Sequence, residues 1–253
     1  MRNWTREETI VAFNVYCKIP FKSSSKSHPT IIKYAKILGR TPSALNMKVG
    51  NIGRLDPDLK NVGIKGLTHG AKIEEEVWNE FYGNPDLLAY ESEKLIAKFS
   101  NQDIALSSNI NTENLPIGGE REAIIKQRVN QSFFRATVIS SYNQKCCISG
   151  VSSPALIEAC HIISWSQDEF NRTNPKNGLC LNSFFHKAYD NNLIGITPDL
   201  KIVVSEEMLD SVSEISFYKY LKELNDRKII LPDRFLPNRE FLELHYKNFL
   251  SHQ

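Results

Sequence analysis

The chain has 253 residues, 41% hydrophobic and 24% charged, so it can bury the core of one large domain or of two ordinary ones, and we favour two. No leader peptide and no apolar run near the ~18 residues of a membrane span stand in the sequence, so we expect a soluble, cytoplasmic protein with no membrane partner. The five cysteines are an odd number without a regular framework, which argues against a secreted disulfide scaffold and predicts reduced thiols.

The net charge of +2 conceals a reversal of sign along the chain. Residues 1–66 contain twelve basic and four acidic residues, a balance of +8, whereas residues 67–120 contain three basic and ten acidic residues, a balance of −7. This asymmetry indicates a polyanionic partner at the N-terminal end, or else two solvated helical faces of opposite sign.

The first predicted elements are helices. Thr5 is an N-cap with two glutamates in the turn that follows, and apolar residues continue at helical spacing. A second helix is expected from about Thr30 to Leu38, with a stop at Gly39, and a third begins at Pro42 after a Thr41 cap. The turn "LGRTPSAL" resembles the turn before the recognition helix of helix-turn-helix and Myb-like domains, although plain helical bundles contain similar pairs.

This resemblance implies contacts with double-stranded DNA. We expect basic residues around the third helix to contact phosphates and its polar residues to approach base edges. The candidate phosphate contacts are Arg40, Lys48 and Arg54, and the candidate base contacts are Ser43, Asn46 and Met47.

The acidic stretch 68–99 predicts two further helices separated by Gly83, Asn84 and Pro85. Residues 100–119 are rich in Ser, Asn and Gly without periodicity, which predicts a linker. We therefore expect a helical domain over 1–99, a linker over 100–120 and a second domain over 121–253.

The second domain is expected to begin with a helix from Arg121, followed by a cysteine-bearing turn and a short hairpin over 144–163. Asn177 and Gly178 then open a short strand, and a helix is predicted over Phe184–Asp190. His186 and Asp190 are four residues apart, so one face of that helix presents both side chains.

The order His161, Asn177, His186, set on strand, loop and helix, resembles the HNH endonucleases, a family of ββα-metal nucleases. The similarity is greatest to a bacterial branch that includes restriction enzymes, and it covers roughly residues 121–253. It rests on "CCISG" at 146–150, "LIEACHIISW" at 156–165 and "NGLCLNSFFHKAYD" at 177–190. It implies an α+β fold, with a helical N-terminal domain and a C-terminal ββα-metal nuclease domain flanked by helices.

The resemblance also implies roles for individual residues. His161 would be the general base, since an imidazole has a pKa near neutrality, and Asn177 would hold the loop that carries it. His186 and Asp190 would bind one divalent metal ion, with Mg, Mn, Ni and Zn all open. One such unit cuts one strand, so simultaneous cutting of both strands implies a homodimer.

One position departs from the family pattern. Many HNH enzymes place Asp or His directly before the base, where this chain has Cys160. A thiolate prefers zinc and other borderline metals to magnesium, so Cys160 is either a ligand for such a metal or an inert packing residue. In the second case Glu158, on the same strand face, would supply a carboxylate. Cys146 and Cys147 resemble half of a zinc knuckle, but no second pair follows at suitable spacing, so no structural zinc is expected.

Three functional hypotheses follow. The first is a metal-dependent DNA endonuclease with a restriction or defence role. The second is a DNA-binding regulator with a degenerate HNH scaffold, suggested only by Cys160. The third is a nuclease effector whose N-terminal half binds a protein or signal.

Overall fold

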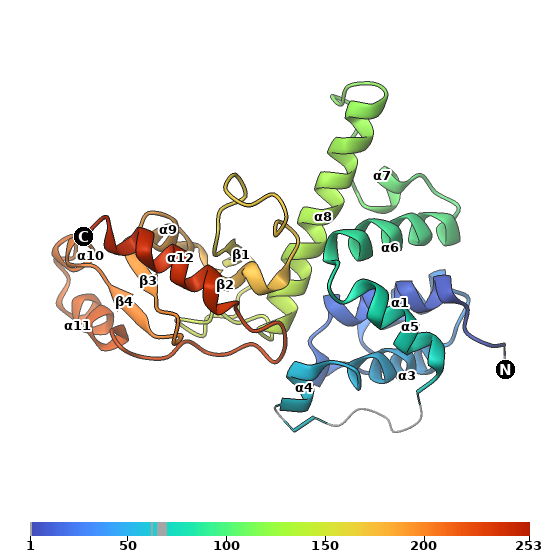
Figure 1. The fold of residues 1–253 in the computed structure, drawn as a ribbon, viewed down its shortest axis with the longest axis horizontal. Helices are drawn as coiled ribbons and strands as arrows, with labels where there is room; N and C mark the ends of the chain where they lie inside the picture. Colours follow the sequence, from blue (N-terminus) through green and yellow to red (C-terminus); the bar gives the residue numbers. More distant parts are fainter. Residues whose placement is uncertain (1, 62, 65–69) are drawn as a thin grey trace. The chain divides into compact units, whose positions relative to one another are not determined.

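A computed structural model describes residues 2–61, 63–64 and 70–253; Lys65, counted among the basic residues above, lies outside them. The chain divides into two compact units, Met1–Ser141 (unit 1) and Tyr142–Gln253 (unit 2). Figure 1 draws unit 1 from blue to green and unit 2 from yellow to red. Helices and two small antiparallel sheets make the fold α+β. Among the described residues, no helix is both long and apolar enough to cross a membrane.

Helix α1 (Arg6–Lys18) is the centre of unit 1. A capping box formed by Thr5 and Glu8 begins it, as the sequence predicts. Ten of its thirteen residues are buried, because α1 packs against several other helices of the unit at once: α2, α3, α5, α6 and α8. The core of unit 1 therefore surrounds α1, and polar as well as apolar residues of this helix are buried in it.

The short helix η1 (Phe21–Ser23) precedes α2 (Pro29–Ile37) and α3 (Pro42–Gly53). Gly39 turns the chain between α2 and α3 with a φ of 59°, and Thr41 caps α3 through its side chain. Both helices and their turn lie where the sequence predicts them. Their role as a DNA-reading helix-turn-helix stays a prediction.

The remaining helices of unit 1 are α4 (Pro57–Asn61), α5 (Lys72–Phe81), α6 (Pro85–Ser100), α7 (Ile104–Ser107) and α8 (Gly119–Ser141). The segment 100–120 is not the expected open linker. Ala105 of α7 is buried against Ile125 and Val129 of α8, and Ile110 and Leu115 pack on the same cluster. These apolar residues, spaced among polar ones, attach the segment and α8 to unit 1, so the division falls after Ser141 instead of near residue 120.

Unit 2 contains the expected strand, strand and helix. Strand β1 (Ile157–His161) pairs antiparallel with β2 (Gly178–Asn182), with His161 opposite Gly178, and α9 (Ser183–Asp190) follows directly. The hairpin expected over 144–163 is therefore wrong, because the partner of β1 comes from the later segment. The short helix η2 (Pro175–Asn177) leads into β2.

The flanking part of unit 2 has a second small sheet and three helices. Strand β3 (Ile194–Ile196) pairs with β4 (Ile202–Val204). They are followed by α10 (Glu206–Asp210), α11 (Ile215–Leu224) and α12 (Arg239–Leu250). Helix α12 packs on β3, with the Phe249 ring so close to Gly195 that a Cβ there would lie 2.9 Å from it. This packing supports the end of α9, which contacts β3 as well.

Candidate active site

Strand β1 and helix α9 bring five of the predicted site residues together. Glu158 and Cys160 alternate along β1 onto the same face, where they meet His186 and Asp190 of α9. His161 ends the strand. The two carboxylates on α9 and β1 lie on either side of the His186 ring, so the ββα unit concentrates acidic groups at one point.

A group of possible metal ligands lies within this cluster. One ligand atom each from Cys160, His186 and Asp190 lies within 4.8 Å of the others. A sulfur, a nitrogen and a carboxylate oxygen make a donor set that suits zinc and neighbouring transition metals. Burial, followed by the nearby Asp190 carboxylate, raises the pKa of the Cys160 thiol. A bound cation would therefore have to displace the thiol proton for sulfur to serve as a ligand.

The sequence offers Glu158 as an alternative metal ligand, but in the structure its carboxylate contacts His186. Its Oε2 contacts Nδ1 of His186, and its Oε1 accepts a hydrogen bond of 3.1 Å from Ser183 Oγ. The other nitrogen of His186, Nε2, lies 3.3 Å from Asp190 Oδ2. A carboxylate on one ring nitrogen fixes the orientation of the ring and directs the other nitrogen to a metal. Glu158 thus supports His186, and it is not one of the three grouped ligand residues.

His161 is held by the loop that follows β1. Its Nε2 lies 2.8 Å from the carbonyl oxygen of Arg172, which can only accept, so Nε2 carries the proton and Nδ1 has the lone pair of the neutral ring. Burial lowers the pKa of His161, although the hydrogen bond to Arg172 acts in the opposite direction. The neutral, proton-accepting form is therefore favoured at neutral pH.

Asn177 ties this loop together from inside and is fully buried. Its Oδ1 accepts a 2.8 Å hydrogen bond from the Ile163 amide, and its Nδ2 donates to the carbonyl oxygens of Ile163 (3.1 Å) and Asn171 (3.3 Å). Ile163 follows His161 by two residues, and Asn171 precedes Arg172, whose carbonyl oxygen orients the His161 ring. Asn177 therefore holds the backbone just after His161 and the backbone next to the Arg172 carbonyl.

The surroundings of His161 include two further residues, Trp165 and Arg172, that the sequence does not single out as site residues. The ring of Trp165 lies edge-on to His161, with centroids 5.8 Å apart. The Arg172 guanidinium lies 4.8 Å from the Trp165 ring and its Nε donates 2.8 Å to the Trp165 carbonyl oxygen. Together they close the loop around His161. The Trp165 contact has a weak sequence signal, an aromatic residue four positions after the base, and the Arg172 carbonyl has none because any residue supplies one.

One segment of unit 2 matches a known protein family. Residues 146–197 match the family model described as HNH endonuclease. The matched segment contains β1, β2 and α9, and with them His161, Asn177, His186 and Asp190. No curated protein sequence matches the chain. The HNH segment therefore confirms the resemblance inferred from the residue order and indicates a nuclease that acts on nucleic acid.

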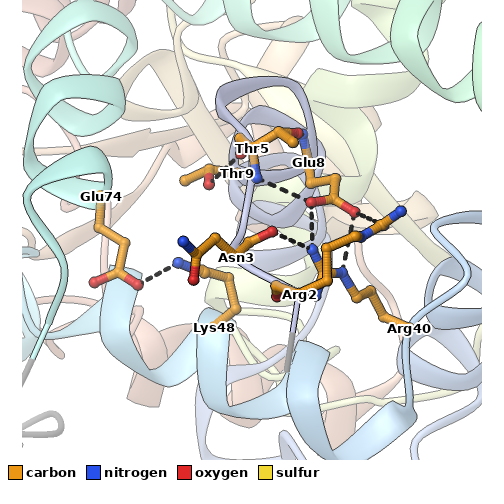
Figure 2. A network of polar contacts seen from close by, with 8 residues as sticks. All are labelled: Arg2, Asn3, Thr5, Glu8, Thr9, Arg40, Lys48 and Glu74. Carbon is orange, nitrogen blue, oxygen red and sulfur yellow. Dashed lines mark hydrogen bonds and ion pairs between the residues drawn. The ribbon is translucent and has the colours of Figure 1, made fainter.

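The predicted DNA contacts lie in unit 1, and two of them, Arg40 and Lys48, are paired with buried carboxylates. Both the Nε and Nη2 atoms of Arg40 donate to the buried carboxylate of Glu8, at 3.0 and 2.7 Å (Figure 2). The Arg40 guanidinium also lies 4.6 Å from the Trp4 ring. Lys48 is 4% exposed, and its Nζ lies 2.5 Å from Glu74 Oε1. Arg40 and Lys48 therefore make their contacts inside unit 1.

The other four candidates lie nearer the surface. Arg54 is half-buried and makes an ion pair of 3.0 Å with Glu75. Ser43 is exposed, as is its neighbour Met47, whereas Asn46 is half-buried and accepts a hydrogen bond of 2.7 Å from Ser24 Oγ. Ser43 and Met47 are therefore the predicted base contacts that a duplex can reach without rearrangement.

Proposed function

We propose that the chain is a metal-dependent endonuclease that hydrolyses phosphodiester bonds in double-stranded DNA. The observation that carries this is the donor group of Cys160, His186 and Asp190 beside His161, inside the segment that matches the HNH endonucleases. The base, the loop-holding asparagine and the donor group are all present together, which argues against a degenerate scaffold.

His161 is assigned the role of general base. Its Nδ1 accepts a proton from water, while the Arg172 carbonyl keeps Nε2 protonated and stabilises the imidazolium that forms. Asn177 keeps the ring in place through the loop, so that the proton transfer needs little rearrangement. The activated water then attacks phosphorus, the bond between phosphorus and the 3′ oxygen breaks, and the departing 3′ oxygen takes up a proton from solvent.

His186, Asp190 and Cys160 are assigned to the metal ion, and Glu158 holds His186 in the orientation for binding. When bound, a divalent ion supplies positive charge to the phosphoryl oxygens and the 3′ leaving oxygen. Zinc or nickel fits the set if the Cys160 thiolate ligates, and magnesium or manganese fits it if Cys160 only packs.

The biological setting is part of the proposal. A restriction or defence role follows from the bacterial enzymes that the sequence resembles, and a cytoplasmic location agrees with it. The described residues contain one such ligand group per chain, so simultaneous cutting of both strands would need a homodimer.

The test is cleavage of supercoiled plasmid and genomic DNA with Mg, Mn, Ni or Zn added to the metal-stripped protein, followed by sequencing of the ends. Nicking or linearisation that depends on a metal and stops with chelator is expected. The absence of cleavage with all four metals would overturn the proposal. Cobalt added to the wild type and to Cys160→Ala then separates the two metal assignments: a thiolate–cobalt absorption band that is lost in the variant identifies Cys160 as a ligand.

A further inference from the structure

The segment from Thr9 to Leu55 contains eight basic residues and no acidic residue. Four of these basic side chains form ion pairs within the described part of unit 1, each with a carboxylate from outside the segment. These pairs are Lys18 with Glu93, Arg40 with Glu8, Lys48 with Glu74, and Arg54 with Glu75. Figure 2 shows two of them, the pairs made by Arg40 and Lys48. These cations are already committed to carboxylates.

A second set of lysines in the same segment has no such partner. Lys26, Lys33 and Lys36 are exposed, and none of them forms an ion pair with an acidic group among the described residues. The Lys33 ammonium group also lies 5.3 Å from the centre of the Tyr34 ring. Their positive charge is therefore available to a ligand from solvent.

The geometry of α2 gathers this charge. Ile31, Tyr34 and Ala35 face the core and are buried, so Lys33 and Lys36 lie on the opposite side of the helix, one turn apart. Lys26 lies three residues before the first residue of the helix. We call the surface made by Lys26, Lys33 and Lys36 the α2 surface.

We propose that the α2 surface is where unit 1 contacts the phosphate backbone of duplex DNA. The proposal rests on the nuclease function proposed above, and it moves the phosphate contacts from Arg40, Lys48 and Arg54 to a neighbouring helix. Clustered uncompensated charge is the footprint of phosphate binding. Exposed Ser27, next to Lys26, adds a hydroxyl of the kind that also contacts phosphates.

The residue type sets the kind of recognition. Lysine ammonium groups act as point charges on flexible stems and impose little geometry on a partner. Contacts to phosphate oxygens position a protein on the duplex without reading its sequence. The α2 surface should therefore strengthen binding to all duplexes alike and leave the choice of cleavage site unchanged.

The test is equilibrium binding of a short duplex to the full chain in chelator, over a series of salt concentrations. The variant carries Lys26→Gln, Lys33→Gln and Lys36→Gln. The control carries Lys72→Gln, Lys94→Gln and Lys126→Gln, which remove the same charge from exposed positions outside the segment. Losing three phosphate contacts should reduce the slope of log affinity against log salt by about 2 to 3 and weaken binding roughly tenfold or more. The control should stay close to wild type.

Three results would overturn the proposal: wild-type binding by the α2-surface variant, an equal loss in the control, or a loss of binding to anionic lipid vesicles with duplex binding unchanged. All substituted side chains are exposed, so circular dichroism and thermal melting should confirm that both variants fold. Binding is measured without metal, so a chain that binds through the α2 surface but never cuts DNA would contradict the nuclease function alone. A chain that cuts while the variant binds normally would contradict the α2 surface alone.

Discussion

In unit 1, the carboxylates of Glu8 and Glu74 are each buried against basic side chains, whereas in unit 2 the carboxylates of Glu158 and Asp190 flank a single histidine. In unit 1, the negative charge of the carboxylates is neutralised by the neighbouring basic side chains. The second arrangement places two carboxylates beside one histidine, a setting in which a bound cation would be stabilised. Carboxylates that face basic side chains thus form a network that supports the fold, whereas carboxylates that face a histidine form a cluster that can bind an ion.

The two clusters also differ in how far their side chains are exposed to solvent. The side chains of Glu8 and Glu74 are 2% and 1% exposed, whereas those of His186 and Asp190 are 25% and 56% exposed. Water, a metal ion and a phosphate can reach the second cluster and not the first. Substitutions should therefore affect chemistry in unit 2 and folding in unit 1.

The largest effect is expected from His161→Ala. Removing a positioned general base should reduce the cleavage rate by ~10²- to 10⁴-fold, because water then loses its proton acceptor. Metal affinity, measured by calorimetry, should hardly change, since His161 is not one of the three grouped ligand residues. His252→Ala, at an exposed histidine near the end of the chain, is the matched control. Cleavage by His161→Ala at the wild-type rate would remove the base from the mechanism.

Glu74→Ala tests the balanced cluster. It leaves the Lys48 ammonium buried without its partner and also removes the hydrogen bond that the Ala71 amide donates over 2.8 Å. Breaking a buried pair in this way costs about 3–5 kcal/mol of unfolding free energy. Glu76→Ala, which breaks the exposed pair with Lys72, should cost less than about 1 kcal/mol. Urea denaturation of both variants measures the difference, and equal costs would mean that Glu74 contributes no more than a surface charge.

Local signals explain what the sequence could predict. The Thr5 cap with its Glu8 partner, and the Gly39, Thr41 and Pro42 signals between two helices, depend only on near neighbours. The spacing of His161, Asn177 and His186 predicted a site because the family resemblance placed them on a known ββα arrangement. The family match covers all three of these residues.

Long-range pairing explains what was missed. The partner of β1 lies beyond a loop of sixteen residues. The prediction of a hairpin over 144–163 is wrong because it relies on a pairing between near neighbours. Lys48 was assigned to DNA although it shares the helical face of buried Leu45, Val49 and Ile52, a spacing that indicates the inward side of α3. Its partner Glu74 comes from a different helix, and no local pattern pairs the two residues.

A smaller effect is expected for Glu158→Ala. Loss of the carboxylate on His186 Nδ1 should weaken metal binding about 10- to 100-fold without removing a ligand. Glu158→Gln keeps an oxygen acceptor and should restore part of the affinity. The tautomer of His186 in the metal-free protein, observed by ¹⁵N NMR, provides an independent measurement: Nδ1 should be the protonated nitrogen in the wild type and lose that preference in Glu158→Ala. An unchanged tautomer in the alanine variant would assign Glu158 to packing alone.

The smallest effect is a pH dependence of stability in unit 1. Burial would raise the pKa of Glu8, but hydrogen bonds from Arg40 and the Thr5 amide, with the charges of Arg40 and Arg2, lower it below the ordinary value of 4.5. A carboxyl whose pKa is lower in the folded state stabilises the fold above its unfolded pKa, and that contribution disappears as the pH falls through the folded pKa. The difference in unfolding free energy between wild type and Glu8→Gln should therefore be largest near neutral pH and shrink as the solution is acidified below 4.5. Chemical denaturation across this range measures it, with Glu76→Gln as the exposed control. A difference that stays constant with pH would show that Glu8 acts through its hydrogen bonds and packing, and that the charge balance drawn for unit 1 does not determine its stability.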